Sequence, residues 1–547
     1  MCRLAIVCAL STLFWAPAAE AQEASACESG TAQATLDVAG ARAVLTNRGP
    51  QFHPPPGSNV GIPYFYEVPK GSGIQSLWTY SLLLAGLVNN EPRSAGRSYR
   101  SAFWPGPYPT ANATADDCSS YNRIWSVRRS DLTRYLQTGD ATTDLLEWPF
   151  HLGAPVIDGD GDPDNYDLEA GDQPALRGDQ TLWWLVNDAN PDAPDDALGV
   201  EVRVEAFAKA SSDAAINEAT FYRYTLTNTT DAPIDSLHAG FFLDSDLGAA
   251  YDDDYFGTDT TLSLWYAYKG IDEDRGGFGA APPALGLTFV ETPVALPDGR
   301  DNDGDGAVDE PGERGSLLAS FRHADDGPTT PLGTYNALQG RQDGGTPFRE
   351  GFQPDGEATT IMFPAEPGDF WSGPCAYPNC NPSLRTDSQQ CVVSGSPFEL
   401  APGESKTVTV ALVYARGTDH LDSVRALRDA TREVRTAYDL GLFEPQAVAD
   451  SEPPPIAGTY VLGAPFPNPA TRAVTVPYRV PAAQGGSIRI TVSDVLGREV
   501  AVVVEGLKPP GAYEAVLNTS AFAPGVYIVR MEHARASVEV QRFTVVR

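Results

Sequence analysis

Glycine and proline recur so often along this chain that long regular helices have little room to form. The sequence of 547 residues contains 51 glycines and 46 prolines. Glycine weakens helices through its flexibility, and proline removes a backbone N–H and breaks them. Many short strands joined by tight turns fit this distribution better than a bundle of helices. We therefore predict an all-β chain, and its length predicts two or three domains in place of one core.

Apolar residues in the middle of the chain alternate or cluster as they do in strands. Residues 200–206 alternate between apolar and charged side chains, which is the period of a half-exposed strand. Strands are also predicted at 181–186 and at 407–414. Residues 221–227 and 236–243 are predicted to form a long antiparallel hairpin. We expect all of these strands to share one large sandwich.

A second kind of period marks one amphipathic helix. Between Asp419 and Leu440 the apolar residues fall largely on one face, and Gly441 then supplies a stop. The apolar stretch 76–84 fits a buried strand or a helix equally well. Residues 245–395 are expected to be inserted as irregular loops and extra strands. The predicted fold of this part is therefore a large irregular β-sandwich-rich domain with one helix packed on it.

The start of the chain looks like an export signal. Residues 1–21 combine a basic start, a short apolar core and an Ala-x-Ala site, which together predict a signal peptide. No later apolar stretch reaches the ~18 residues that a membrane-crossing helix needs. We expect an exported protein without a transmembrane helix.

Proline-rich sequence divides the rest of the chain behind residue 443. Residues 22–443 are predicted to form the large β-rich domain, with two subdomains as an alternative that splits near 145–195. Residues 444–457 contain three consecutive prolines and predict a semi-rigid linker. Residues 458–547 then form a separate C-terminal domain.

The C-terminal domain has the pattern of an immunoglobulin-like sandwich. Such a fold packs short strands at even spacing, separated by turn residues. The strands are predicted at 474–480, 488–492, 499–504, 512–517, 526–531 and 538–545.

Three short motifs in this domain resemble a known family. They are Pro467-Asn468-Pro469, the run from Val492 to Val500 that contains Asp494-Val495-Leu496-Gly497-Arg498, and the run from Ala523 to Tyr527. In this order they resemble the type A C-terminal sorting domain of the type IX secretion system, although Ser493 stands where the family usually has an aromatic residue. An ordinary terminal immunoglobulin-like module is the alternative.

The resemblance implies a route and a partner. The secretion machinery would recognise residues 458–547, carry the chain across the outer membrane, and release it or attach it to the cell surface, often with cleavage of the tag. The front of the chain is more weakly similar to large cargo proteins of this system, at 66–70, 103–107, 178–184 and 244–248. That similarity concerns location and assigns no chemistry.

Charge excludes one class of partner. The formal net charge of −34 at pH 7 would repel a nucleic-acid backbone, so no nucleic acid is expected. The acidic residues are instead grouped in loops. The sharpest group is Asp301, Asp303, Asp305 and Asp309, with Gly306 at the sixth position. This spacing is typical of a calcium loop.

That first loop departs from an EF-hand at its end. The twelfth position is Gly312, for which Glu310 or Glu313 would have to substitute. No helical pattern flanks the loop, so it is more similar to the Asp-rich repeats of extracellular proteins. A solvated acidic turn is the alternative.

A second acidic loop contains Asp158, Asp160, Asp162 and Asp164, with Glu169 at the twelfth position. Pro163 replaces the glycine at the sixth position, so calcium and a solvated turn both remain interpretations. A third cluster holds carboxylates that would repel one another without a cation, and a metal or a solvated loop accounts for it equally well. Its members are Asp244, Asp246, Asp252, Asp253, Asp254 and Asp259.

Cysteine offers a disulfide more readily than a metal site. Five cysteines follow the predicted signal peptide: Cys27, Cys118, Cys375, Cys380 and Cys391. The last three share one loop-like stretch, where we expect a bridge. Zinc would need a fourth ligand, and no other His or Cys lies nearby.

Catalytic motifs are missing from the sequence. It contains no H-E-x-x-H, no G-x-S-x-G and no P-loop, and its six histidines are scattered. We therefore predict a secreted or cell-surface, calcium-binding, non-enzymatic structural or adhesive protein. The alternative is a polysaccharide-binding protein or glycoside hydrolase, in which exposed tryptophans would form a sugar platform and two carboxylates would be paired in space. That alternative would add a surface polysaccharide to the partners.

Overall fold

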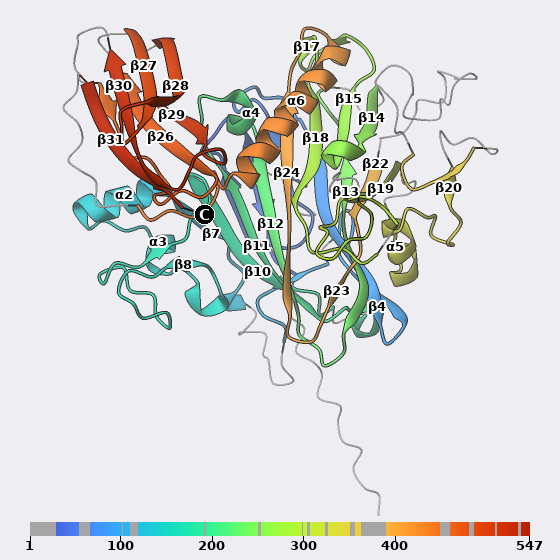
Figure 1. The fold of residues 1–547 in the computed structure, drawn as a ribbon. Helices are drawn as coiled ribbons and strands as arrows, with labels where there is room; N and C mark the ends of the chain where they lie inside the picture. Colours follow the sequence, from blue (N-terminus) through green and yellow to red (C-terminus); the bar gives the residue numbers. More distant parts are fainter. Residues whose placement is uncertain are drawn as a thin grey trace, which may run out of the picture.

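The computed structural model confirms a mostly β-strand chain of several antiparallel sheets (Figure 1). It describes residues 29–53, 66–100, 102–109, 119–190, 193–249, 253–297, 299–302, 307–322, 327–349, 356–362, 390–448, 460–480, 486–508, 511–533 and 538–546. The predicted signal peptide, Cys27, Cys118, Cys375 and Cys380 lie outside these residues.

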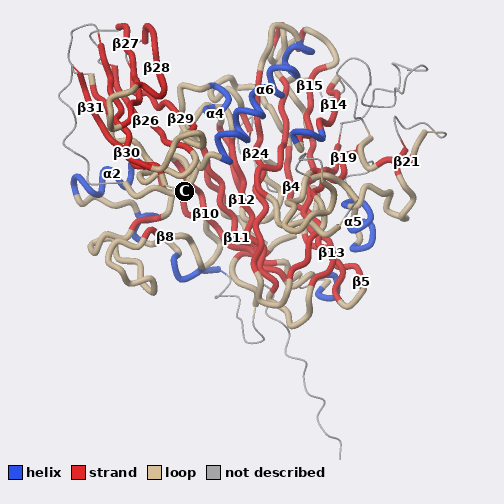
Figure 2. Tube along the Cα trace, viewed as in Figure 1, coloured by secondary structure: helices blue, strands red, loops and turns tan. Residues whose placement is uncertain are grey.

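A nine-stranded sheet forms the centre of the large domain (Figure 2). Its strands run in the order β14-β15-β18-β24-β12-β11-β10-β6, and β7 also pairs with β10. Their bounds are Asp254–Asp259 (β14), Leu264–Lys269 (β15), Ala284–Glu291 (β18), Ser405–Ala415 (β24), Thr220–Asn228 (β12), Val200–Ala208 (β11), Gln180–Asn187 (β10), Trp104–Pro105 (β6) and Trp125–Arg128 (β7). The predicted strands at 181–186, 200–206, 221–227 and 407–414 are all confirmed here.

A six-stranded sheet packs against the first one. Its order is β19-β22-β13-β4-β5, with β23 paired to β13. The bounds are Leu317–Arg322 (β19), Gln390–Gly395 (β22), Ile234–Asp244 (β13), Thr79–Val88 (β4), Glu91–Ala95 (β5) and Phe398–Leu400 (β23). The apolar stretch 76–84 is thus largely a strand. Residues 245–395 supply strands to both sheets, as expected.

Aromatic side chains fill the space between the two sheets. Tyr80 of β4 and Tyr224 of β12 meet across the layers with 2.6 Å between their hydroxyl oxygens. Phe241 of β13 contacts both rings: it stacks on Tyr80 with ring centroids 5.2 Å apart, and its centroid lies 5.8 Å from that of Tyr224. Such pairs add ~0.5–1.5 kcal/mol beyond the burial of their surface. The core of the sandwich is therefore rich in aromatic side chains, and the Tyr80 and Tyr224 hydroxyls bond to each other within it.

The predicted hairpin of 221–227 and 236–243 is wrong. β12 and β13 are consecutive, but they belong to different sheets. Asn228 ends β12 by donating its amide to the carbonyls of Ala232 and Leu400, at 2.8 and 3.0 Å. This fixes a corner through which the chain crosses from one layer to the other. Period-2 alternation predicts a strand but does not reveal its neighbour.

The predicted amphipathic helix is confirmed as α6, His420–Asp439. Asp419 caps it by accepting a hydrogen bond from the Asp422 N–H at 2.7 Å. Its buried face, which includes Val424, Leu427 and Val434, covers the outer face of the nine-stranded sheet (Figure 1). Other helices were not predicted: α2 (Arg129–Thr138), α3 (Thr143–Leu146), α4 (Ala214–Asn217) and α5 (Pro331–Leu338). α2 fully buries only Leu132, and its ten residues are too few for an apolar pattern that marks a helix in the sequence.

Smaller elements surround the sandwich. A three-stranded sheet joins Gln33–Leu36 (β1), Arg42–Thr46 (β2) and Tyr66–Glu67 (β3). Two-stranded ladders join Val156–Ile157 (β8) to Gln173–Pro174 (β9), Glu273–Asp274 (β16) to Gly279–Ala280 (β17), and Phe348–Arg349 (β20) to Ala358–Thr359 (β21). Single 3-10 turns are Phe150–Leu152 (η1), Pro194–Asp196 (η2) and Thr260–Leu262 (η3).

The C-terminal domain is a small two-sheet sandwich, as predicted. One sheet orders β25-β26-β29 and the other β28-β27-β30-β31. The bounds are Val461–Leu462 (β25), Ala473–Val480 (β26), Gly486–Asp494 (β27), Glu499–Lys508 (β28), Gly511–Asn518 (β29), Gly525–His533 (β30) and Val538–Val545 (β31). Its hydrophobic cluster contains only residues of 460–545, so the core belongs to this domain alone.

The first residues of the predicted linker are held against the large domain. The side-chain amide of Gln173 donates to the Val448 carbonyl at 2.9 Å and accepts from the Val448 N–H at 2.7 Å. Arg177 reaches Glu444 at 3.3 Å, and Phe443 is buried. We call residues 444–448 with Gln173 the linker clamp. The rest of the predicted linker, 449–457, lies outside the described residues.

Replacing Gln173 by leucine should release the linker clamp while leaving the sandwich intact. Two hydrogen bonds are lost, each worth a net ~0.5–1.5 kcal/mol, so the free energy of local opening at 444–448 should fall by about 2 kcal/mol. Hydrogen exchange at Val448 measures this. Gln342→Leu, at an exposed position, is the control. Unchanged exchange in Gln173→Leu would contradict the clamp.

Candidate functional sites

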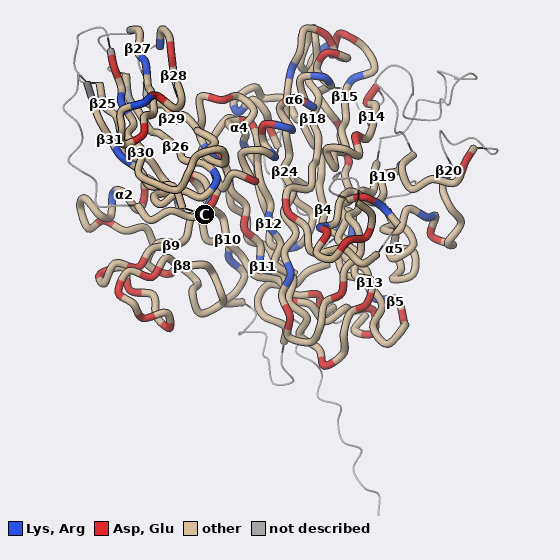
Figure 3. The backbone as a smooth tube through the Cα atoms, in the orientation of Figure 1, with Lys and Arg blue, Asp and Glu red and all other residues tan. Residues whose placement is uncertain are grey.

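The acidic loop, residues 158–172, is closed at its base by the β8–β9 ladder. Figure 3 shows Asp and Glu gathered along it. One carboxylate oxygen from each of Asp158, Asp160 and Asp172 lies within 4.8 Å of the others. Asp158 and Asp160 are exposed, whereas the Asp172 side chain is only 1% exposed. Three acidic groups therefore converge at one end of this loop.

Backbone N–H groups hold the acidic loop in its turn-by-turn shape. Asp158 accepts hydrogen bonds from the N–H groups of Asp160 and Gly161, at 3.1 and 2.6 Å. The Asp160 carboxylate accepts from Asp162, and the Asp162 carboxylate from Asp164, at 2.8 and 3.1 Å. Hydrogen bonds from the Asp162 N–H and then from Asn165 lower the pKa of Asp160, which favours its anionic form.

Asp172 joins the two ends of the acidic loop. Its two oxygens accept from the Gly159 N–H at 2.9 Å and the Asp167 N–H at 2.7 Å. Nearby, the buried amide oxygen of Asn165 has no hydrogen-bond partner among the described residues. No described Arg or Lys forms an ion pair with Asp158, Asp160 or Asp172. The loop thus presents oxygen atoms and no protein cation.

The structure places the predicted residues of this loop in two groups. Asp158 and Asp160 meet, while Asp162, Asp164 and Glu169 lie outside the three-carboxylate group. Sequence reasoning missed Asp172, because it stands at the fifteenth position of a loop that was read against a twelve-residue template. Its signal was available: an acidic residue directly before the closing strand β9 ends the loop, just as Asp158 directly follows β8.

The loop that contains Asp301, Asp303, Asp305 and Asp309, which we call the Asp301 loop, is described only in part, because Asp303 and Asp305 lie outside the described residues. Asp309 has a left-handed backbone, with φ of 54°, and its carboxylate accepts from the Gly299 N–H at 3.1 Å. Glu313 is buried and accepts a hydrogen bond from the Asn302 N–H, next to Asp301. Glu313 therefore lies at the start of the loop, where a substitute for the missing twelfth ligand would have to be.

The third cluster is neutralised from within the protein. Lys269 of β15 is fully buried, and its ammonium lies 2.5 Å from Asp253 and 2.9 Å from Asp254. Asp244 accepts a hydrogen bond from the Tyr99 hydroxyl at 2.6 Å, and Asp259 pairs with Arg428 at 3.2 Å. Asp252 lies outside the described residues. Four of the six carboxylates of this cluster thus have a protein partner, and Asp253 and Asp254 share Lys269.

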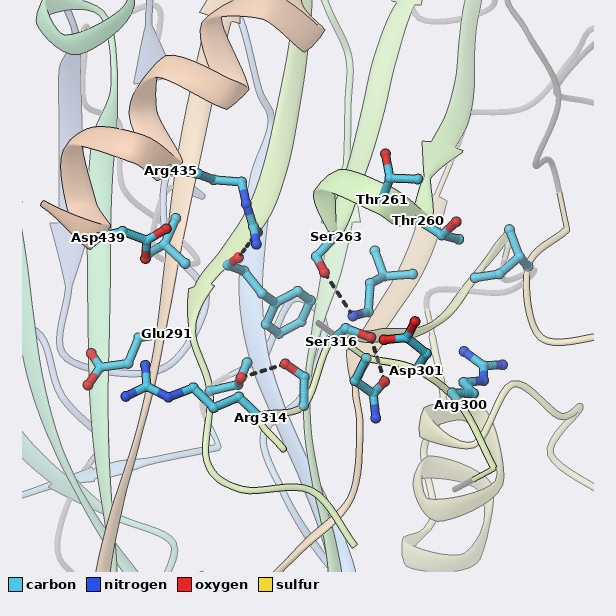
Figure 4. A pocket seen from close by; sticks show the side chains of 17 residues that line it. Thr260, Thr261, Ser263, Glu291, Arg300, Asp301, Arg314, Ser316, Arg435 and Asp439 are labelled. Carbon is cyan, nitrogen blue, oxygen red and sulfur yellow. Dashed lines mark hydrogen bonds between the residues drawn. The ribbon is translucent and has the colours of Figure 1, made fainter. Parts of the chain in front are cut away.

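A polar cleft of about 980 Å³ opens between the C-terminal end of α6, η3 and the segment 291–317 (Figure 4). Arg300, Arg314 and Arg435 bring positive charge to it, and Glu291, Asp301 and Asp439 bring negative charge. Arg435 is committed to backbone carbonyls, including Leu262 at 3.1 Å. Asp301 lines this cleft, so the Asp301 loop begins in its wall.

Two features of the described residues bear on sugar chemistry. Trp104, Trp125, Trp148, Trp183, Trp184 and Trp265 are buried, and Trp78 is half-buried with its ring edge-on to His53. Glu291 contacts Arg223 at 3.4 Å and accepts from the Tyr438 hydroxyl at 2.7 Å. Burial opposes ionisation of Glu291, but Arg223 overcomes it and lowers the pKa of that carboxyl. A glycosidase acid needs the opposite shift.

Comparison with known proteins identifies one part of the chain. Residues 464–546 match the family described as "Secretion system C-terminal sorting domain". No curated protein matches the chain. Among solved structures, a polysaccharide lyase matches with 8% identity and a TM-score of 0.23, over 95% of this chain and 47% of that one. The chain thus spans about half the length of that lyase, and so low a TM-score carries no argument about activity.

The family match agrees with the motifs and the sandwich at the end of the chain. No helix among the described residues combines the length and apolar character that crossing a membrane requires. Residues 464–546 thus belong to the secretion system C-terminal sorting domain family, and the chain is a type IX secretion cargo that crosses the outer membrane to the cell surface or the medium.

Proposed function

We propose that the large domain is a non-enzymatic structural or adhesive protein whose surface loops are stiffened by calcium outside the cell. The observation that supports this most is the convergence of Asp158, Asp160 and Asp172 without a protein cation. Like charges held this close favour the uptake of a cation. Export places the loop outside the cytoplasm, the setting of weakly binding extracellular calcium modules.

The ligand chemistry of the acidic loop suits calcium better than softer metals. Calcium takes six to eight oxygen ligands in flexible geometry, from carboxylates, amide and backbone carbonyls and water. The three carboxylates and the unpartnered Asn165 amide oxygen are all hard donors. Softer metals prefer thiolate or imidazole ligands, and neither a cysteine nor a histidine belongs to this group. Calcium bound at the Asp301 loop would likewise stiffen the wall of the cleft to which Asp301 belongs.

The described residues give the polysaccharide alternative less support. A sugar platform needs an exposed aromatic face, and six of the seven described tryptophans are buried while Trp78 is partly covered. The cleft is lined mainly by polar and charged side chains and the buried Phe289. The role we propose for these tryptophans is therefore packing in the protein interior.

Calcium should raise the melting temperature of the full-length secreted protein. At a free concentration one hundred times Kd, binding adds about 2.7 kcal/mol to the free energy of unfolding. For a domain of this size that corresponds to a shift of about 3 °C. Thermal denaturation in calcium and after chelation measures this, with isothermal titration to count sites.

Variants of the acidic loop connect any calcium effect to its carboxylates. Asp158→Asn/Asp160→Asn alters exposed groups, so the chelated protein should melt as the wild type does, and the calcium shift should shrink. Asp231→Asn, an exposed carboxylate in the corner between β12 and β13, is the matched control and should keep the full shift. If chelation changes neither melting nor protease resistance in the wild type, the proposal fails.

A further inference from the structure

Exposed aliphatic side chains are concentrated in the sorting domain. Of the fifteen large hydrophobic residues that are exposed among the described residues, nine belong to this domain and six to the much larger one before it. Five of the nine lie in the hairpin of β27 and β28. We call them the apolar hairpin edge: Val495, Leu496, Val500, Val502 and Leu507.

β28 is apolar in sequence, but none of its residues is fully buried. Six of its ten residues are Ala, Val or Leu, and every one of the ten remains at least partly exposed. In β30 of the same sheet, by contrast, Tyr527, Val529 and Met531 alternate into the core. Ala501, Val503 and Val504 of β28 pack against that core without being fully buried, whereas Val500, Val502 and Leu507 remain exposed. An exposed aliphatic row of this kind is expected to be covered by something else.

The backbone of β28 is open as well. It is the first strand in the order β28-β27-β30-β31, and among the described strands it pairs only with β27. An exposed edge strand offers unpaired N–H and C=O groups to another chain. Its acidic side chains are engaged within the sheet, since Arg489 of β27 lies 3.0 Å from Glu499 and 3.4 Å from Glu505. Beside these paired charges, the edge presents open backbone and the exposed aliphatic side chains of Val500, Val502 and Leu507.

The turn at the tip of this hairpin is held rigidly. Asp494 accepts hydrogen bonds from the N–H groups of Leu496 and Arg498, at 2.9 and 3.0 Å, and from the Arg498 guanidinium at 2.7 Å. Gly497 provides the left-handed backbone, with φ of 78°. Leu496 is nevertheless 75% exposed. The Asp-x-x-Gly-Arg motif thus fixes a turn whose aliphatic side chains point into solvent.

We infer that the apolar hairpin edge is where the sorting domain docks on the outer-membrane secretion machinery, which adds an extended apolar segment to the open edge of β28. The partner follows from the family match of residues 464–546, which contain the whole hairpin. Strand addition supplies main-chain hydrogen bonds, and the aliphatic side chains supply contact area. The inference rests on the export route and is independent of calcium.

The test is export of the full-length protein carrying Val502→Lys/Leu507→Lys in a bacterium with this secretion system. Both side chains are exposed, so the fold should be retained, while lysine on an edge strand blocks the addition of another strand. The fraction outside the cell should fall by about tenfold or more, as 1.4 kcal/mol of lost contact would produce, with accumulation in the periplasm. The matched control is Val540→Lys on β31, the opposite edge of the same sheet, which should be exported normally.

Two further measurements separate docking from folding and from self-association. The purified variants should melt at the same temperature as the wild type. If a lysine variant melts lower, Val502→Thr, which keeps the shape and strand propensity of valine, takes its place in the export test. Normal export of the double lysine variant, or an equal loss in Val540→Lys, would overturn the inference. A wild-type dimer that Val502→Lys dissociates while export continues would also overturn it, because a second copy would then be the occupant.

Discussion

Replacing Lys269 by methionine is expected to lower the free energy of unfolding by about 3–5 kcal/mol, the typical cost of removing one partner from a buried ion pair. The Lys269 ammonium lies between Asp253 and Asp254 and has no exposure to solvent. Burial raises the pKa of Asp254 to about 6, and Lys269 acts against that rise. Without Lys269, the buried Asp254 carboxylate would have no cation beside it.

The loss of stability in Lys269→Met should depend on pH. The folded-state pKa of Asp254 lies above its ordinary value of 3.8, and loss of Lys269 raises it further. A carboxyl of this kind stabilises the fold while protonated, and that contribution is lost as pH rises through the folded-state pKa. Lys269→Met should therefore be closer to the wild type at pH 5 than at pH 8.

Urea denaturation of the two proteins at both pH values measures this difference. Lys269→Met/Asp254→Asn, which removes the stranded charge, should recover part of the lost stability. A loss below about 1 kcal/mol in Lys269→Met, the scale of an exposed pair, would contradict the buried triad.

Deleting residues 458–547 should abolish export and leave the large domain in the periplasm. The family match places the sorting signal in this part. The truncated protein should still fold, because the hydrophobic clusters of the large domain contain no residue beyond Val448. The one ion pair described between the two parts, Lys209–Glu514 at 3.0 Å, is the contact that would be lost.

Cell fractionation with immunodetection follows both halves of that experiment. Residues 458–547 fused to a periplasmic reporter protein should carry it outside, since the C-terminal core is complete in itself. Glu514→Ala, which breaks only the ion pair, should be exported as the wild type is. Normal release of the truncated chain would refute the role given to the sorting domain.

Local patterns predicted most of the elements. α6 could be placed because its apolar stripe runs for five turns between a capping aspartate and Gly441, whose backbone is left-handed with φ of 76°. All six predicted strands of the sorting domain are present, because apolar runs mark the strands and Gly or Pro marks most of the turns between them.

Long-range partners could not be predicted in the same way. The corner at Asn228 depends on the carbonyl of Leu400, which is 172 residues away. For the acidic third cluster the sequence left a metal and a solvated loop as equal interpretations, because Lys269 stands apart from it in sequence and reaches it only through the pairing of β14 with β15. Asp172 was missed for a related reason, since its closeness to Asp158 results from the β8–β9 ladder and not from loop spacing.

The linker clamp determines where a mechanical load enters the large domain. A machine that pulls on the sorting domain transmits its force along the chain to Val448, and from there through two hydrogen bonds to Gln173. Gln173 directly follows Asp172, the buried carboxylate that ties the ends of the acidic loop together. A pulling force during translocation would thus first reach the acidic loop, where we propose a bound ion. An ion held there would oppose unfolding of that loop.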